Sequence, residues 1–245
     1  MIDILATPLA LIAILVALHA YFGLEILRRG IIFTDLAIAQ AAALGVAISL
    51  GYFHSHYLYA LTLGFALSTA LLIAYMSGKT RHLEAFIGIL YVLSASAIML
   101  VLSHSAEGME HFKALLANDI LFVLPSELAT SATIYAGVAV ALLALLPRLS
   151  GLLREVAFFS LLAITVTSSV SLAGVFVVFA LLIAPPLSAI TFGAKRALLF
   201  SLVFGWSLSV VATVLSYHFD LPTGYAIVFM LSLASAIIVI LKRSR

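Results

Sequence analysis

The chain has no cysteine and few charged residues, and both shortages limit what it can be. Without cysteine there is no disulfide, no thiolate metal ligand and no cysteine redox chemistry. Charged residues make up 9% of the 245 residues and hydrophobic residues 65%, and the mean hydropathy is +1.29. A soluble domain needs a wetted surface, with charged residues at about a quarter of the chain. The composition therefore excludes a soluble fold and predicts an integral membrane protein.

Sequence patterns typical of catalysis are also missing. No Gly-rich phosphate loop of the form G-x-x-x-x-G-K-[ST] occurs, so any ATP hydrolysis would belong to another chain. No span carries paired carboxylates, a nucleophile with a base, or a His-Glu metalloprotease motif. We therefore expect a protein that is not an enzyme and that holds no permanent cofactor. The net charge is only +2, and we expect contact with membrane lipid and none with nucleic acid.

The chain does contain a series of long apolar runs, which end at Gly, Pro or charged residues. Runs of about 20 residues fit helices that cross a hydrocarbon core of about 30 Å at about 1.5 Å per residue. The predicted fold class is all-α, a polytopic helical membrane protein with eight or nine transmembrane helices. The predicted spans are 4–26, 31–51, 57–77, 84–104, 127–147, 154–173, 175–192, 197–217 and 224–241.

The stretch 154–192 is the least regular of these apolar segments. Gly174, Pro185 and Pro186 interrupt it and predict a broken helix pair, with one span plus a re-entrant helix as the alternative. The first span, 4–26, follows Asp3 and has no basic segment before it. We therefore expect it to be a retained span and not a cleaved signal peptide.

The basic residues predict the orientation in the membrane, because cytoplasmic loops carry an excess of Lys and Arg. With nine spans and the N-terminus outside, five basic groups share the cytoplasmic side and only Lys113 lies outside. The five groups are Arg28 with Arg29, Lys79 with Arg81, Arg148 with Arg154, Lys195 with Arg196, and Lys242 with Arg243 and Arg245. We predict an outside N-terminus, a cytoplasmic C-terminus and two spans within 154–192.

The stretch 28–45, RRGIIFTDLAIAQAAALG, places Asp35 and Gln40 in an apolar helical segment behind two arginines. A charged side chain at membrane depth costs about 3 kcal/mol or more, so such groups usually face a cavity or a partner and mark a path for an ion or substrate. We predict that Asp35 lines such a path. The alternative is a salt bridge from Asp35 to Arg28 or Arg29. For Gln40 the alternative is a hydrogen bond between helices.

The predicted outer side is rich in groups that attract or bind cations. The candidates for an outer vestibule are His54, His56, His104, Glu110, His111, His218 and Asp220. This pattern indicates an entrance for a positive ion. The alternative is that loops without Lys and Arg keep other polar residues by default, and the His-x-His motif at 54–56 does not define a metal site alone.

Four stretches, in order along the chain, are RRGIIFTDLAIAQAAALG at 28–45, EAFIGILYVLSASAIMLVLS at 84–103 with EGMEHFKALLANDILFV at 107–123, SSVSLAGVFVVFALLIAPP at 168–186, and FDLPTGYAIVF at 219–229. Together they resemble the membrane subunit of ABC-type metal-ion uptake transporters, the permease family for zinc, manganese and iron. The resemblance implies a single permease domain over 1–245 in the prokaryotic cytoplasmic (inner) membrane. It also implies two permease copies, cytoplasmic ABC ATPase subunits and an extracytoplasmic metal-binding protein.

The resemblance also implies a site for the transported divalent cation on the second span. Family permeases place an Asp and, four residues later, a His there. Asp35 matches the Asp, whereas the His position falls on Ala39 and the nearest polar side chain is Gln40. In a regular helix residues i and i+5 point roughly 140° apart, so we hypothesise a π-bulge between 35 and 40 that turns Gln40 back toward Asp35. An oxygen-only site would favour manganese or iron over zinc.

The stretch that joins the fifth and sixth spans departs from the family pattern. The family carries a short ATPase-docking helix there, whereas this chain has only PRLSGLLRE at 147–155. The candidates for facing the ATPase are Arg148, Arg154 and Glu155. The first hypothesis for function is the permease subunit of an ATP-driven divalent-metal importer. The alternative is an ATPase-independent cation carrier, or a non-transporting membrane subunit, on the same scaffold.

Overall fold

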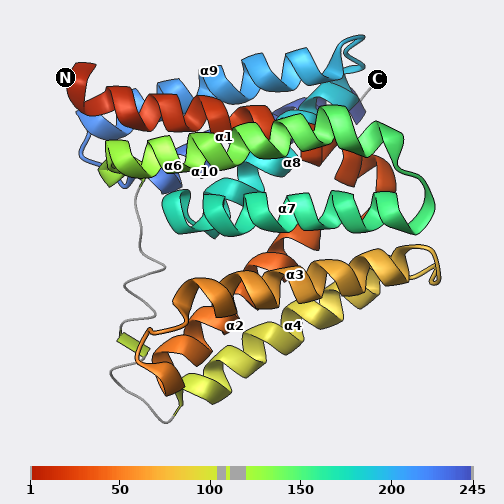
Figure 1. The fold of residues 1–245 in the computed structure, drawn as a ribbon. Helices are drawn as coiled ribbons and strands as arrows, with labels where there is room; N and C mark the ends of the chain where they lie inside the picture. Colours follow the sequence, from red (N-terminus) through yellow and green to blue (C-terminus); the bar gives the residue numbers. More distant parts are fainter. Residues whose placement is uncertain (1, 104–108, 111–119, 244–245) are drawn as a thin grey trace. The chain divides into compact units, whose positions relative to one another are not determined.

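The computed structural model describes residues 2–103, 109–110 and 120–243 (Figure 1). Within these residues all regular structure is helical, and nine helical segments are long and apolar enough to cross a membrane. The all-α polytopic fold is therefore confirmed, and the predicted spans agree with the helices to within a few residues. The helices are α1 Ile2–Arg29, α2 Thr34–Phe53, α3 Leu58–Ser77, α4 Leu83–Leu102, α6 Pro125–Val140, α7 Gly151–Ala173, α8 Val175–Phe192, α9 Ala197–His218 and α10 Thr223–Arg243.

The helices fall into two compact units. The first unit comprises residues 1–30, 119–135 and 172–245, and the second comprises 31–118 and 136–171. Each unit is held together by its own helix contacts, because packing within it buries small and apolar side chains against neighbouring helices. The single permease domain over 1–245 stays a prediction.

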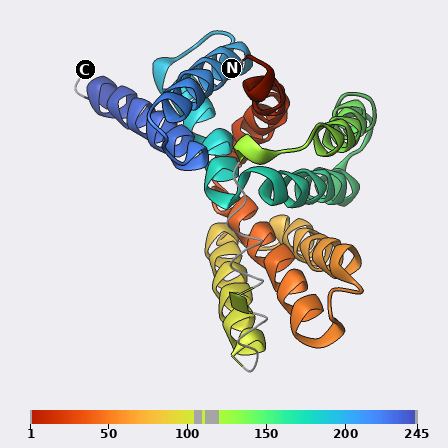
Figure 2. The same cartoon turned by 90° about the vertical axis from the view of Figure 1, so that its left-hand side faces the viewer.

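In the first unit α8 is the central helix. It packs against α1, α9 and α10, and Figure 2 shows α8 (cyan) with α1 (dark red) on one side and α10 (blue) on the other. Its side chains are apolar almost all round, as expected for a helix surrounded by other helices. Pro185 and Pro186 lie inside this continuous helix. Gly174, with φ 82° and ψ 155°, separates α7 from α8, and both helices are long and apolar enough to cross a membrane, as expected for two spans within 154–192.

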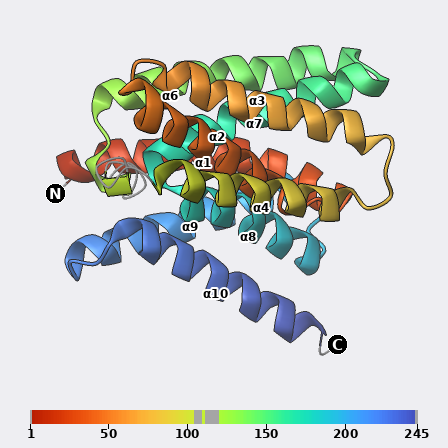
Figure 3. The ribbon, with the colours of Figure 1, turned by 90° about the horizontal axis from the view of Figure 1, so that it is seen from below.

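In the second unit α2 lies between α3 and α4 (Figure 3). Small residues allow the close approach: a Cβ on Gly45 would lie 2.4 Å from the carbonyl oxygen of Leu61 in α3. On the α4 side Ala47 packs in a buried apolar cluster with Ile98 and Leu102. Lipid tails are as apolar as the helix surfaces, so the hydrophobic effect does not drive helices together within a membrane. Close packing does, and small residues permit it.

The fifth span runs from Pro125 to Arg148 and changes its helical winding before it ends. Residues Ala141–Leu145 form a π-helix (η2), and Leu146–Arg148 form a 3-10 turn (η3). The N–H of Leu146 bonds to the carbonyl of Ala141, five residues back. Pro147 has no N–H to continue an α-helical ladder. Only Leu149 and Ser150 then connect this span to α7.

Candidate functional site

The candidate site begins where α1 turns into α2. Arg28 and Arg29 occupy the last turn of α1, where cations interact favourably with the helix dipole. Gly30 has φ +67°, a conformation that favours glycine at helix ends. The hydroxyl of Thr34 donates to the carbonyl of Ile31 at 2.7 Å, which stabilises the turn that leads into α2. This turn places Asp35 in the first turn of α2.

Asp35 is 1% exposed, and its Oδ1 atom accepts no hydrogen bond from the residues described. The carboxylate lies near the backbone N–H groups of Asp35 itself and of Leu36, which belong to the donors that a helix N-terminus leaves unpaired. Arg28 pairs instead with Glu25, at 2.9 Å. The alternative of a salt bridge from Asp35 is therefore wrong for Arg28, and for Arg29 it stays a prediction. A buried carboxylate oxygen without a donor is costly and needs an explanation.

The hypothesis of a π-bulge between Asp35 and Gln40 is wrong. Helix α2 is a regular α-helix from Thr34 to Phe53, so Gln40 points roughly 140° away from Asp35. Gln40 is partly buried. The residue that shares a helix face with Asp35 is Ala39, one turn on, and it is 4% exposed. Asp35 and Gln40 therefore do not form a joint ligand pair in this chain.

The face of α2 that carries Asp35 continues through Ala39 and Ala42 to Ser49, at helical spacing. These side chains are all buried, and the Ser49 hydroxyl, like Asp35 Oδ1, has no hydrogen-bond partner among the described residues. Small side chains thus separate two buried polar groups along one helix face. The sequence analysis missed Ser49. Ser49 follows Asp35 by fourteen residues, which is about four helical turns, so both side chains lie on the same face.

Glu84, the second residue of α4, is another group that sequence reasoning missed. Its Oε1 atom accepts a hydrogen bond from the backbone N–H of Phe33, at 3.2 Å, and its Oε2 atom is buried without a partner. The fold therefore places two carboxylates near one end of the second unit, although the sequence shows no paired carboxylates within a span. The available signal was that both Asp35 and Glu84 follow a basic loop on the predicted cytoplasmic side.

The structure describes five of the seven outer vestibule candidates. His54, His56, Glu110, His218 and Asp220 are all exposed, while His104 and His111 lie outside the described residues. Within residues 2–103, 109–110 and 120–243, no group of three or more His, Asp or Glu could hold a metal ion. Their role as a cation entrance stays a prediction.

Two of these residues have a local structural role. His54 ends α2 in the left-handed conformation, with φ 47°, and its N–H bonds to the carbonyl of Ser49. Such an αL residue satisfies the free carbonyls at a helix C-terminus. Asp220 has φ 52° in the turn between α9 and α10. Turn chemistry therefore accounts for the backbone at both positions without reference to a ligand.

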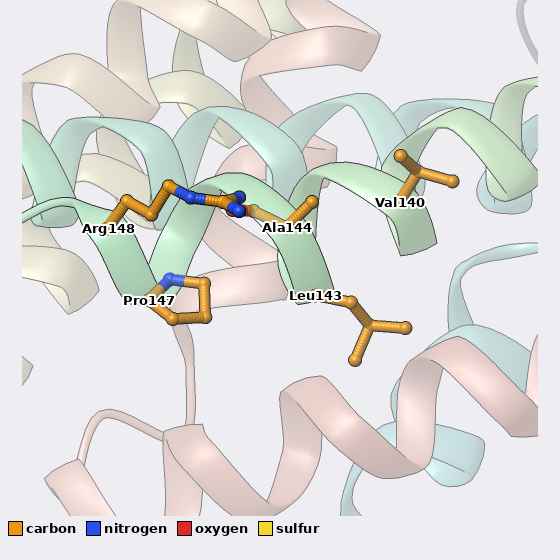
Figure 4. Close-up of a pocket in the computed structure, with 5 residues that line it drawn as sticks. All are labelled: Val140, Leu143, Ala144, Pro147 and Arg148. Carbon is orange, nitrogen blue, oxygen red and sulfur yellow. The ribbon is translucent and has the colours of Figure 1, made fainter.

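The candidates for facing an ATPase lie around the two-residue connection. Arg148 and Arg154 are exposed and Glu155 is partly buried. Figure 4 shows that Arg148 lines a pocket with a volume of about 620 Å³, together with Val140, Leu143, Ala144 and Pro147. A guanidinium nitrogen of Arg148 donates to the carbonyl of Ala144, so the arginine folds back along the π-helix. The contact with an ATPase stays a prediction.

Fold and site together define a class of protein: a multi-span helical membrane protein with a buried carboxylate at the start of its second span. The comparisons with known proteins agree with this class. The model of the ABC 3 transport family matches residues 148–242. A probable iron transport system membrane protein from Haemophilus influenzae is 30% identical over 151 residues, which is 55% of this chain and 56% of that protein. The aligned part thus spans little more than half of that relative.

The solved structures extend the likeness over nearly the whole chain. The structure of PsaBC from Streptococcus pneumoniae in complex with Fab has a TM-score of 0.72 at 19% identity, covering 96% of this chain and 90% of that one. A transporter described as of the metal-chelate ABC type, in an inward-facing conformation, has a TM-score of 0.59 at 19% identity, covering 96% and 80%. The resemblance to the ABC-type metal permease family is therefore confirmed, and the chain has the fold of such a permease.

Proposed function

We propose that this chain is the membrane-spanning permease subunit of an ABC importer for divalent metal cations. The observation that carries the proposal is Asp35, a buried carboxylate with an unpartnered oxygen at the start of α2. A carboxylate at membrane depth is expected to face a path or a partner. The match of residues 148–242 to the ABC 3 transport family supports the same function.

The transported ion is a divalent cation that accepts oxygen ligands. Ala39 stands where the family places a histidine, and Gln40 points away from Asp35, so the described part of α2 offers carboxylate oxygen and no imidazole. Hard oxygen donors favour manganese or iron(II) over zinc. The iron system named for the Haemophilus influenzae relative is compatible with this preference. The ion is cargo, and the protein needs no resident cofactor.

The assembly has three other components. A second copy of the chain completes the path, ABC ATPases bind at the predicted cytoplasmic side near Arg148, Arg154 and Glu155, and an extracytoplasmic protein delivers the metal. The permease domain spans 1–245 in a prokaryotic cytoplasmic membrane. Its outer vestibule includes His54, His56, His104, Glu110, His111, His218 and Asp220.

One observation favours a second candidate function. Only Leu149 and Ser150 connect the fifth span to α7, which leaves no room for a separate docking helix. An ATPase-independent cation carrier, or a non-transporting membrane subunit, would need no such helix. The two candidates differ in whether an ATPase accompanies the chain, which purification from the native host decides.

Metal uptake by whole cells tests the path. The native chain, Asp35→Ala and Gln40→Ala are expressed at matched membrane abundance, and uptake of radioactive manganese, iron and zinc is measured. We expect uptake in the native chain and in Gln40→Ala, because Gln40 lies off the Asp35 face. We expect a loss of at least tenfold in Asp35→Ala. Unchanged uptake in Asp35→Ala would contradict the proposed path.

A further inference from the structure

Glu84 joins the start of α4 to the start of α2. Its Oε1 atom accepts a hydrogen bond from the N–H of Phe33, the residue that precedes α2 and that makes no capping bond with its own side chain. A carboxylate that accepts a free N–H at a helix N-terminus stabilises that terminus. Glu84 performs this role from another helix, and it does so two residues before Asp35.

Only one oxygen of Glu84 is used in that contact. Its Oε2 atom is buried and has no hydrogen-bond partner among the described residues, and the same holds for Oδ1 of Asp35. Buried polar atoms are almost always hydrogen-bonded, and a carboxylate oxygen without a donor is especially costly. Two such oxygens near one helix terminus indicate a ligand that supplies positive charge.

No side chain of the described chain supplies that charge by an ion pair with Asp35 or Glu84. Arg28 pairs with Glu25 at 2.9 Å, and the ammonium of Lys79 lies over the ring of Tyr75, 3.4 Å from its centre. Glu84 accepts the N–H of Phe33, two residues before Asp35, so both carboxylates lie at the start of α2. Asp35 is buried and Glu84 is partly buried, and two carboxylates that repel each other are stabilised when a cation lies between them.

We propose that Glu84 supplies the second carboxylate of the cation site at Asp35, at the end of α2 and α4 that the basic loops predict to face the cytoplasm. This inference rests on the proposed function. Asp35 Oδ1 and Glu84 Oε2 bind the divalent cation as it passes, and Glu84 Oε1 keeps the start of α2 in place. Paired carboxylates suit a hard divalent cation such as manganese or iron(II).

Substitutions separate the charge of Glu84 from its capping role. Glu84→Gln keeps an oxygen that can accept the Phe33 N–H and removes the charge, whereas Glu84→Ala removes both. Glu84→Asp keeps the charge. Glu127→Gln is the matched control, because Glu127 also accepts a backbone N–H at the start of a span, from Leu124 at 2.9 Å. Radioactive manganese uptake is measured in cells against manganese concentration and is divided by membrane abundance.

We expect Glu84→Gln to lose at least tenfold in uptake at low manganese, with a weaker apparent affinity, and Glu84→Asp to restore part of it. Glu127→Gln should transport like the native chain. Native uptake and affinity in Glu84→Gln would overturn the proposal, and a loss confined to Glu84→Ala would assign Glu84 a positioning role only. If Glu84→Gln lowers membrane abundance, the two variants are compared by uptake per chain. Glu84→Asp should then transport more per chain than Glu84→Gln, and equal uptake per chain would overturn the proposal. Absence of manganese uptake by the native chain would instead contradict the proposed function.

Discussion

Gly23 of α1 lies directly against the carbonyl of Leu182 in α8, so closely that a Cβ on Gly23 would stand 1.8 Å from that oxygen. The carbonyl of Leu182 would normally accept the N–H of the residue four positions on, which is Pro186 and has none. The bare α-carbon of Gly23 therefore approaches an oxygen that its own helix leaves unpaired, where a weak Cα–H···O contact can form.

We expect Gly23→Ala to destabilise the protein by about 1–3 kcal/mol, because the added methyl group forces α1 and α8 apart. Thermal unfolding in mild detergent measures the effect. Gly88→Ala in α4 is the control, since a Cβ there meets nothing within 4 Å. Equal stability of the Gly23→Ala and Gly88→Ala variants would contradict the close packing of α1 on α8.

The hydroxyl oxygens of Ser188 in α8 and Ser235 in α10 lie 2.8 Å apart, and each lies 2.9 Å from the carbonyl oxygen of Ala184. Their two protons serve two of these three contacts at a time, so one hydroxyl can donate to the other while the other donates to Ala184. Hydrogen bonds between membrane helices contribute about 0.6 kcal/mol on average and at most about 1.7. A double-mutant cycle with Ser188→Ala, Ser235→Ala and the pair should therefore give a coupling energy in this range. Strictly additive effects on unfolding would show that the two hydroxyls act independently.

Gly174, the single residue between α7 and α8, has φ 82° and ψ 155°, a region that only glycine adopts without strain. We expect Gly174→Ala to cost about 1–3 kcal/mol and to lower membrane abundance. Gly137→Ala, in α6 and with open space around it, provides the comparison at an ordinary helical position. A Gly174→Ala protein with the same unfolding temperature as the native chain would contradict this account.

The spans were predictable because hydropathy and length are local properties of the sequence. The span 175–192, for example, coincides with α8 in spite of Pro185 and Pro186, since packing on three sides supports a helix that proline weakens. The π-helical segment was not predictable. The family pattern predicts a π-bulge between Asp35 and Gln40, whereas the structure has a π-helix at Ala141–Leu145. Its cause is the adjacent Pro147, which has no N–H.

The site was only partly predictable. Asp35 stands out as a charge in an apolar run, so the sequence alone makes it a candidate, and its role in a path stays a prediction. The sequence did not indicate Glu84 as a site residue. Its contact with Phe33 joins the starts of two helices, and such a contact depends on how α2 and α4 pack. His54 has a local structural role that its residue type did not indicate, because its φ of 47° makes it the C-cap of α2, while its role at a cation entrance stays a prediction.

The ATP dependence of metal uptake tests the central claim most directly. The chain is purified from its own host in mild detergent with whatever binds it, reconstituted in liposomes with its delivery protein, and supplied with radioactive manganese or iron. We predict an ATPase in about equal amount and metal accumulation that requires ATP and is lost in Asp35→Ala. An intact, folded chain that carries no ATPase, and metal movement indifferent to ATP, would contradict the assignment as an ABC importer subunit.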